Sequence, residues 1–163
     1  MTYILGIDPG SRVTGFGVIR QQGNKVTYIN SGCIRTSGAD FALRLREIFE
    51  GVQQIVRTYQ PQMVAIEKVF VKINVESALK LGQARGAALC ACVLDGAKVS
   101  EYSPTQVKRT VVGAGRASKE QVQHMVMRLL QLSDMPSSDA ADALAIALCH
   151  VQHEGIRRLA SVV

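Results

Sequence analysis

The sequence predicts one α/β domain, built on a central five-stranded mixed sheet that is flanked by helices. Two observations lead to this prediction. Short apolar or alternating segments typical of strands fill the first third of the chain, and helix-like and strand-like segments then alternate before a helical last third. At 163 residues the chain has the length of a single domain and can bury a core without disulfides. We assign residues 1–163 to one domain and expect a flexible tail after residue 153.

Five strands are expected, and the first three should form an antiparallel meander. The apolar run that ends at Asp8 indicates a strand buried on both faces, and Pro9 and Gly10 after it favour a turn. Glu67 ends another apolar run, which we interpret as a strand with this acid at its carboxyl end. The expected strands are residues 3–8, 14–19, 26–34, 62–67 and 99–103.

Five helices are expected from apolar residues that recur every three or four positions. Pro61 follows the first helix, and Ser118 with Gln121 forms a capping box that begins the fourth. Small residues at positions 84, 87, 88 and 91 would let the second helix pack closely against another helix. The expected helices are residues 41–59, 76–94, 104–112, 118–130 and 136–150.

The charge of the chain is basic, with 19 Lys and Arg against 13 Asp and Glu. A basic surface attracts polyanions, chiefly nucleic acid, with anionic membranes as another candidate. A soluble basic protein with no nucleic-acid role would explain this charge about as well. No segment approaches the ~20 apolar residues that cross a bilayer, and the amino terminus lacks a basic leader. We therefore expect a cytoplasmic protein that does not bind membranes.

The four cysteines form no C-x-x-C pair and have no histidine at the spacing of a zinc site. We expect all four to be reduced and mostly buried. We also expect surface or capping roles for the three histidines, His124, His150 and His153.

Four acidic residues are candidates for one site. Asp8 and Glu67 end predicted strands, and the carboxyl ends of neighbouring strands line the ligand crevice of open α/β sheets. Asp139 and Asp142 are three residues apart in the predicted first turn of the last helix, so they share a face. Converging carboxylates repel one another, and hard divalent cations such as Mg²⁺ relieve that repulsion. In nucleases, two such ions ~3.5–4 Å apart hold the attacking and leaving oxygens.

Each of these acids also has a simpler explanation when it is considered alone. Asp139 and Asp142 would suit the positive end of a helix dipole, whatever their function. Asp8 before Pro-Gly is a common turn former, and Glu67 would suit the solvated end of a strand. Spacing alone therefore leaves metal binding and a purely structural role both open.

Six motifs, in a fixed order, carry a resemblance to a known family. They are GIDPGS with TGFG (residues 6–11 and 14–17), AIE with VF (65–67 and 69–70), SALKLGQARG (77–86), QVKRTVVG (106–113), KEQVQH (119–124) and DAADAL (139–144). They extend over essentially the whole chain. On these motifs the sequence resembles the RuvC family of Holliday-junction resolvases, within the ribonuclease H-like superfamily, and this resemblance implies a ribonuclease H-like fold.

The resemblance also implies an activity. Members are Mg²⁺-dependent endonucleases that bind four-way DNA junctions as homodimers and make symmetric paired nicks during recombination and repair. It implies that Asp8, Glu67, Asp139 and Asp142 are the catalytic residues and metal ligands. It also implies two Mg²⁺ ions per active site, which Mn²⁺ can replace, and water as the attacking group. A branch-migration helicase complex is the further partner that it implies.

Five residues are candidates for binding DNA. The resemblance implies that Lys108 and Lys119 lie near the DNA and that Phe70 meets bases at the junction. Lys72 beside Phe70 indicates a basic, solvated loop, which favours base stacking over burial of the ring. Arg116 follows a glycine-rich segment that suits phosphate contacts, or that forms an ordinary solvated loop. Residues 68–76 depart from the family pattern, so their individual contacts stay open.

Two alternative functions remain. A related ribonuclease H-like nuclease would act on structured RNA, and a binding module would hold junctions without cutting them. An actin-like phosphotransferase shares the Asp-Pro-Gly-Ser type of turn, but it needs two duplicated domains, and this chain contains no internal repeat. Comparing the cleavage of four-way DNA junctions and of structured RNA, with and without metal, separates the remaining candidates.

Overall fold

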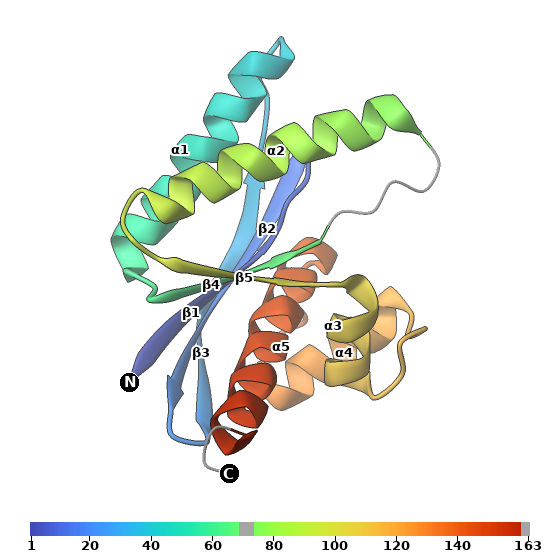
Figure 1. Ribbon diagram of the computed structural model, residues 1–163. Helices are drawn as coiled ribbons and strands as arrows, with labels where there is room; N and C mark the ends of the chain where they lie inside the picture. Colours follow the sequence, from blue (N-terminus) through green and yellow to red (C-terminus); the bar gives the residue numbers. More distant parts are fainter. Residues whose placement is uncertain (69–73, 161–163) are drawn as a thin grey trace.

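The computed structural model describes residues 1–68 and 74–160 of the chain. In that part, five strands form one sheet in the order β3-β2-β1-β4-β5, and helices cover both of its faces (Figure 1). The strands are β1 (Thr2–Asp8), β2 (Val13–Gln22), β3 (Lys25–Arg35), β4 (Met63–Glu67) and β5 (Lys98–Tyr102). The helices are α1 (Phe41–Tyr59), α2 (Val75–Val93), α3 (Pro104–Val112), α4 (Lys119–Leu129) and α5 (Ser138–Ala160).

The sheet is mixed, as the sequence predicts. Strands β1, β2 and β3 form an antiparallel meander, while β4 runs parallel to both β1 and β5. The parallel pairs require crossover connections, and these contain α1 between β3 and β4 and α2 between β4 and β5. The expected α/β class with five strands and flanking helices is therefore confirmed.

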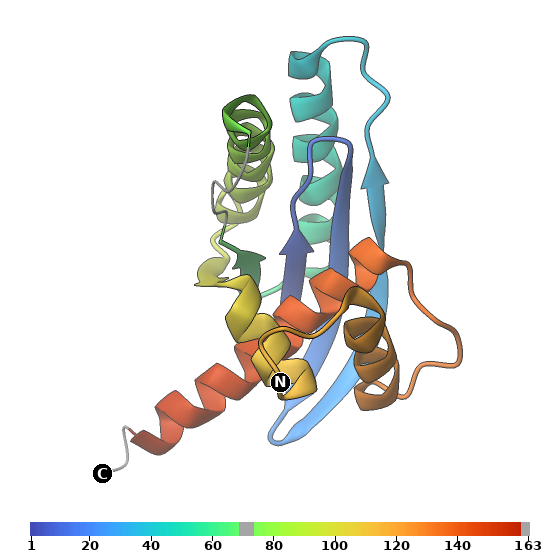
Figure 2. The same cartoon turned by 90° about the vertical axis from the view of Figure 1, so that its right-hand side faces the viewer.

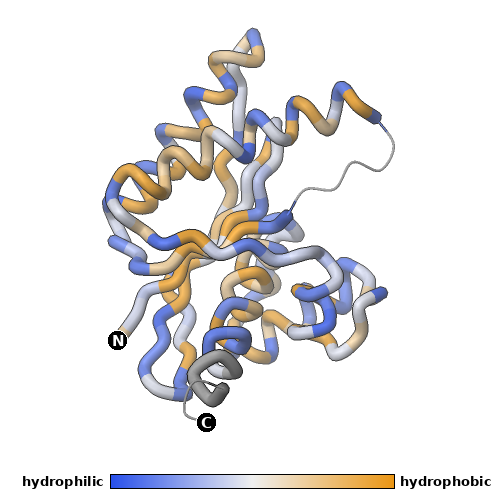
Figure 3. The backbone as a smooth tube through the Cα atoms, viewed as in Figure 1, coloured by the Kyte–Doolittle hydropathy of each residue, from blue (hydrophilic) through white to orange (hydrophobic). Residues whose placement is uncertain are grey.

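Each strand near the centre of the sheet contributes side chains to two separate cores. Leu5 and Ile7 of β1 belong to the cluster that α1 and α2 complete, whereas Ile4 belongs to the cluster that α3, α4 and α5 complete. Figures 1 and 2 show these two groups of helices on opposite sides of the sheet. The tube in Figure 3 is most hydrophobic along the strands between them, as expected for strands buried on both faces.

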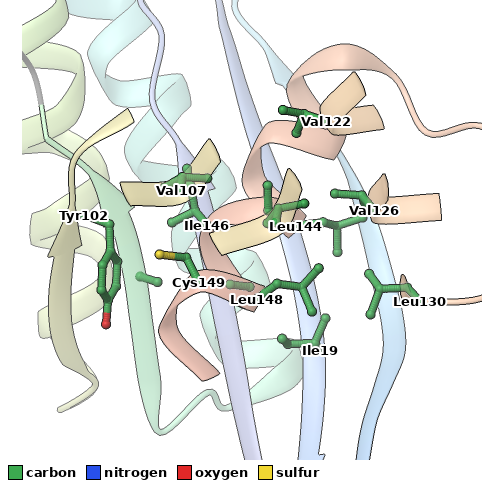
Figure 4. Packing of buried hydrophobic residues seen from close by; sticks show 14 of the residues in the cluster. Ile19, Tyr102, Val107, Val122, Val126, Leu130, Leu144, Ile146, Leu148 and Cys149 are labelled. Atoms are coloured by element: carbon green, nitrogen blue, oxygen red, sulfur yellow. The ribbon is translucent and has the colours of Figure 1, made fainter. Parts of the chain in front are cut away.

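Helix α5 lies directly against β1 and β2, closer than a layer of side chains would allow. Its inner surface is rich in alanine, and a Cβ atom built at Gly6 of β1 would collide with the carbonyl oxygen of Ala143. Leu144 and Ile146 of α5 pack with Val107 of α3 and Val122 of α4, as the close view shows (Figure 4). This core fixes the position of α5 across the sheet.

On the other face, α2 packs closely against α1, which confirms the role expected for its small residues. Ala84, Ala88 and Ala91 are fully buried there. The opposite side of α2 remains exposed, and it carries Val75 and Leu79.

The sequence analysis was wrong about the end of α5, which continues to Ala160 instead of ending at His150. The continuation has tertiary support, because Val151 packs against the α5 core and the ring of His153 stacks on Tyr102 with the ring centroids 5.1 Å apart. His150 is also not at the surface as expected. It is buried, and its Nδ1 lies 2.8 Å from the hydroxyl of Tyr102.

The cysteines are all free thiols, as expected, but only Cys92 and Cys149 are buried. Cys33 is half-buried and Cys90 is exposed on α2. No helix within residues 1–68 and 74–160 combines the length and the apolar character that crossing a membrane requires.

Candidate functional site

Asp8 and Glu67 lie next to each other at one edge of the sheet. Ile7 and Ile66 are register partners in the parallel β1–β4 pair, and each of the two acids follows immediately on its own strand. Because side chains alternate along a strand, Asp8 points to the same side as Gly6, and Glu67 to the same side as Ala65. That side is the one covered by α5. Both carboxylates therefore project toward the helix that carries the other two acids.

Gly15 determines how close Asp139 lies to Asp8. It is the register partner of Asp8 in the antiparallel β1–β2 pair. A Cβ built at Gly15 would collide with the carbonyl oxygen of Asp139 and would lie 3.2 Å from the Asp139 Cβ. Only glycine permits this approach of helix to strand. The first turn of α5 is thus seated over the end of β1.

Asp142 lies one turn further along α5 than Asp139, because residues three apart on a helix are neighbours on one face. The sequence analysis placed both acids in the first turn, but only Asp139 is there, since α5 begins at Ser138. Both side chains are half-buried. The explanation of Asp142 as a first-turn acid is therefore weaker than the sequence suggested.

The turn after Asp8 is braced by Thr14, which is fully buried. Its hydroxyl donates to the carbonyl of Gly10 over 3.1 Å and accepts from the amide of Gly10 over 3.3 Å. This pair of bonds closes the loop between β1 and β2. It fixes the backbone immediately beyond Asp8.

The electrostatic effect of this grouping is large at Asp8. Burial raises the pKa of its carboxyl from 3.8 to about 7, and the charges of Glu67, Asp142 and Asp139 add to the increase. Burial also raises the pKa of Glu67 and of Asp142, with a further increase from the neighbouring acids. The four acids therefore form one partly desolvated cluster of negative charge, which we call the acidic cluster.

Two lysines lie beside the acidic cluster. Lys119 Nζ is 3.5 Å from Asp142 Oδ2, and this pair raises the lysine pKa. Lys108 lies near enough to lower the pKa of Glu67. Lys119 is the first residue of α4, where Ser118 and Gln121 form the expected capping box, with each side chain bonded to the other residue's amide.

The chemistry of the acidic cluster fits a hard divalent cation, but the side chains do not form a closed cage. Within the described part of the chain, no three His, Cys, Asp or Glu side chains converge closely enough to hold one ion. Mutual repulsion separates like charges, and Lys119 draws Asp142 to itself. All four donors are nevertheless carboxylate oxygens, which are the ligands that Mg²⁺ prefers. Besides burial, the neighbouring acids help to raise the pKa values of Asp8, Glu67 and Asp142, so a positive charge among them would be stabilised.

The candidate DNA-binding residues fall into two groups. Lys108 and Lys119 lie at the acidic cluster, and Arg116 is exposed on the segment between α3 and α4. Phe70 and Lys72 lie outside the described residues.

Sequence reasoning missed two residues that contact the main chain of acids in the cluster. One is Gly15, although two glycines spaced two apart in a predicted strand are a recognisable signal of close backbone approach. The other is Arg85 of α2, whose Nε donates to the main-chain carbonyl of Glu67 over 3.1 Å. No local pattern in the sequence points to that contact.

The strand order, the crossing helix and the acids at the ends of β1 and β4 define the class as a ribonuclease H-like α/β protein. Within this class, the family model described as "Crossover junction endodeoxyribonuclease RuvC" matches residues 4–150. The chain belongs to the RuvC family.

Similar proteins agree with this assignment. The crossover junction endodeoxyribonuclease RuvC of Shewanella sp. (strain MR-4) is 59% identical over 150 residues, which cover 92% of this chain and 87% of that protein. The Thermus thermophilus RuvC structure is 36% identical with a TM-score of 0.84, and the match covers 94% of this chain and 96% of that one. A T. thermophilus RuvC structure in complex with a Holliday junction substrate matches with a TM-score of 0.87, at 37% identity over 94% of this chain and 95% of that one.

Proposed function

We propose that this protein is a Holliday-junction resolvase, an endonuclease that cuts four-way DNA junctions in recombination and repair. The observation that carries the proposal is the acidic cluster, assembled from β1, β4 and α5 in a chain that is 59% identical to a named crossover junction endodeoxyribonuclease. A relative with 37% identity has been solved in complex with a Holliday junction. With DNA as the substrate, we place the protein in the cytoplasm, where its free thiols would stay reduced.

In this proposal, Asp8, Glu67, Asp139 and Asp142 are the catalytic residues and hold the metal, which is Mg²⁺ in two copies, with Mn²⁺ able to replace it. Such ions activate water and stabilise negative charge on the phosphoryl oxygens. The pKa of Asp8 is raised to about 7, so its carboxyl is only partly ionised at neutral pH when no metal is bound. Metal binding by the Asp8 carboxylate should therefore strengthen as the pH rises.

Lys108, Lys119 and Arg116 would offset the repulsion between the acidic cluster and the DNA backbone. Carboxylates alone repel phosphates, whereas the two lysines put positive charge within electrostatic reach of the same acids. Arg116 is exposed nearby in sequence and extends this basic edge. Phe70 stacking on an unpaired base and Lys72 contacting the backbone stay predictions from the sequence, as does the helicase partner.

We also propose that the protein works as a homodimer through the exposed side of α2. Paired nicks in a two-fold junction require two active sites. That side presents Val75 and Leu79, which are 69% and 64% exposed, and leaves open space at Gly82 and Gly86, where a second helix could approach. Leu79→Glu should give monomers in sedimentation analysis, while Leu129→Glu, on the exposed side of α4, should stay dimeric.

The experiment that tests the function is cleavage of a labelled synthetic four-way junction, with and without Mg²⁺. The wild-type protein should make paired nicks only with the metal, and Asp8→Asn should bind the junction without cutting it. Asp95→Asn is the matched control, because it removes the same charge from an exposed turn between α2 and β5. Nicking by Asp8→Asn at the wild-type rate would refute the proposed role of the cluster.

The same assay separates the alternatives. A structured RNA cut as fast as the junction would favour a nuclease acting on RNA. Tight junction binding without cleavage in either Mg²⁺ or Mn²⁺ would favour a module that binds without cutting.

A further inference from the structure

Arg85 links α2 to the end of the strand that carries Glu67. Its side chain is only 18% exposed, and its Nε donates a hydrogen bond of 3.1 Å to the carbonyl oxygen of Glu67. Arg85 reaches this carbonyl from the side of the sheet covered by α1 and α2. The Glu67 carboxylate projects to the other side, so Arg85 contacts the main chain of this residue and not its carboxylate.

A second contact fixes the guanidinium itself. Arg85 Nη2 lies 3.0 Å from Glu101 Oε1, at an angle that makes an ion pair but not a hydrogen bond. Glu101 lies on β5 beside Tyr102, which is the register partner of Glu67. The arginine therefore joins the ends of β4 and β5 from one helix.

The peptide unit between Glu67 and Lys68 is held at both of its polar groups. Its carbonyl accepts from Arg85, and its amide, the N–H of Lys68, donates to the carbonyl of Tyr102 over 2.8 Å. A peptide unit fixed at both groups cannot rotate about the backbone bonds on either side of it. These two bonds therefore restrain the ψ angle of Glu67, and with it the direction in which its Cα–Cβ bond leaves the strand.

This restraint acts at the point where the pairing between β1 and β4 ends. The β1–β4 register ends at the pair Ile7–Ile66, so Glu67 has a pairing partner only on the β5 side. Without Arg85, the Glu67–Lys68 peptide unit would keep its bond from the Lys68 amide to Tyr102, but its carbonyl would lose the bond from the arginine. An acid on a strand end that can twist offers a poorer ligand than one whose backbone is fixed.

We propose that Arg85 is a positioning residue that holds Glu67 in the orientation needed to bind metal. The inference rests on the proposed role of Glu67 as a ligand. It assigns to Arg85 no contact with the DNA, the metal or the reacting atoms.

The test compares the metal requirement of Arg85→Met with that of the wild-type protein. The Mg²⁺ concentration for half-maximal junction cleavage should rise about 10- to 100-fold, as is typical when an outer partner of a metal ligand is removed. Calorimetry should show the same weakening of Mg²⁺ binding to the DNA-free protein. Junction affinity in EDTA should stay within about twofold of wild type, because Arg85 does not contact DNA in this proposal.

Three further variants make the result specific. Arg46→Met removes one exposed arginine from α1 and controls for net charge. Glu101→Gln removes the ion pair but leaves the bond to the Glu67 carbonyl, so it should keep a metal requirement close to wild type. Arg85→Lys retains the charge and one donor, and it should give an intermediate shift.

An unchanged Mg²⁺ requirement in Arg85→Met would overturn the proposal, and so would a loss of junction affinity as large as the loss of metal affinity. If Arg85→Met does not fold, Arg85→Lys decides: a raised metal requirement supports the proposal and an unchanged one refutes it. Glu67→Gln is measured in parallel. If Glu67→Gln cuts like wild type, the proposed metal site fails; if Glu67→Gln is inactive while the Arg85 variants behave as wild type, only the positioning role fails.

Discussion

Gly15 of β2 touches the backbone of Asp139 on α5, with no side chain between the strand and the helix. Gly15 is also the residue opposite Asp8, so this contact sets the separation between two acids that are far apart in sequence. The arrangement depends on the absence of a single methyl group.

Gly15→Ala should therefore damage both stability and cleavage. The added Cβ would collide with the Asp139 carbonyl, and relieving such a collision by shifting backbone typically costs about 1–3 kcal/mol. Urea denaturation should show a lower free energy of unfolding, and the cleavage rate should fall at saturating Mg²⁺. Gly155→Ala is the control on the same helix: its added Cβ meets nothing within 4 Å, so stability should be unchanged or slightly higher. Equal unfolding free energies and cleavage rates in the two variants would contradict the close contact between Gly15 and Asp139.

Asp8→Asn should stabilise the metal-free protein in a pH-dependent way. The pKa of Asp8 rises from 3.8 to about 7 on folding, so between these values the folded protein retains a proton that the unfolded chain has lost. Wild-type stability must then fall through this group as the pH rises across the window. The advantage of Asp8→Asn in EDTA should be small near pH 4, should grow toward pH 7 and should level off above it.

Denaturation curves collected across that pH range measure the difference directly. Asp95→Asn, in the exposed turn after α2, is the comparison and should show little change with pH. An advantage of Asp8→Asn that shrinks as the pH rises would have the wrong sign for a carboxyl whose pKa is raised by burial.

Lys119→Met should tighten Mg²⁺ binding to the protein without DNA. The lysine lies 3.5 Å from Asp142 and adds positive charge to the acidic cluster, which opposes a second cation there. The lysine side chain is 66% exposed, and such ion pairs are worth at most about 1 kcal/mol. We therefore expect a gain of about two- to fivefold in calorimetric titrations.

Junction affinity should change in the opposite direction in Lys119→Met, because a positive charge near the phosphates is lost. Lys25→Met, at the exposed start of β3, controls for net charge and should leave Mg²⁺ binding unchanged. Weaker Mg²⁺ binding by Lys119→Met would mean that the lysine organises the acids instead of competing with the metal.

Tyr102→Phe should destabilise the protein without changing its chemistry. The Tyr102 hydroxyl lies 2.8 Å from His150 Nδ1 in the core between β5 and α5, and losing a buried hydrogen bond typically costs about 1–3 kcal/mol. The unfolding free energy should fall by that amount, while cleavage at temperatures where the variant is folded should match wild type. Tyr59→Phe removes the half-buried bond to Asn30 and should cost less. Equal losses of unfolding free energy in the two variants would show that the buried Tyr102–His150 bond stabilises the protein no more than the half-buried Tyr59–Asn30 bond does.

Much of this fold could be predicted from local patterns. Apolar periodicity identified each strand and helix, and the capping box at Ser118 gave the start of α4. The site could be predicted in part, because β1 and β4 run parallel, so that Asp8 and Glu67 meet at one edge. The positions of strand ends and helix faces depend on short-range patterns, and a single sequence contains those patterns.

The missed features depend on contacts between distant segments. The continuation of α5 beyond His150 goes with the packing of Val151 against the core and the stacking of His153 on Tyr102. The burial of His150 likewise requires a tyrosine from β5 to be nearby. In the sequence, Arg85 is not distinguishable from any other arginine on a helix. Its contact with Glu67 exists only because α2 packs beside the end of β4. Such roles become visible only when the elements are assembled.

The contact between the backbone of α5 and the glycine-bearing strands limits which substitutions this protein can accept during evolution. Hydrophobic core residues can be exchanged for others of similar volume, and neighbouring elements adjust by small shifts. Main-chain atoms already in contact leave no such freedom, since no substitution makes them smaller. At Gly15 the backbone of α5 is therefore already in contact with β2 and cannot move closer to it. Main-chain contacts therefore set the separation of Asp8 from Asp139, whereas core side chains away from these glycines can be replaced by others of similar volume.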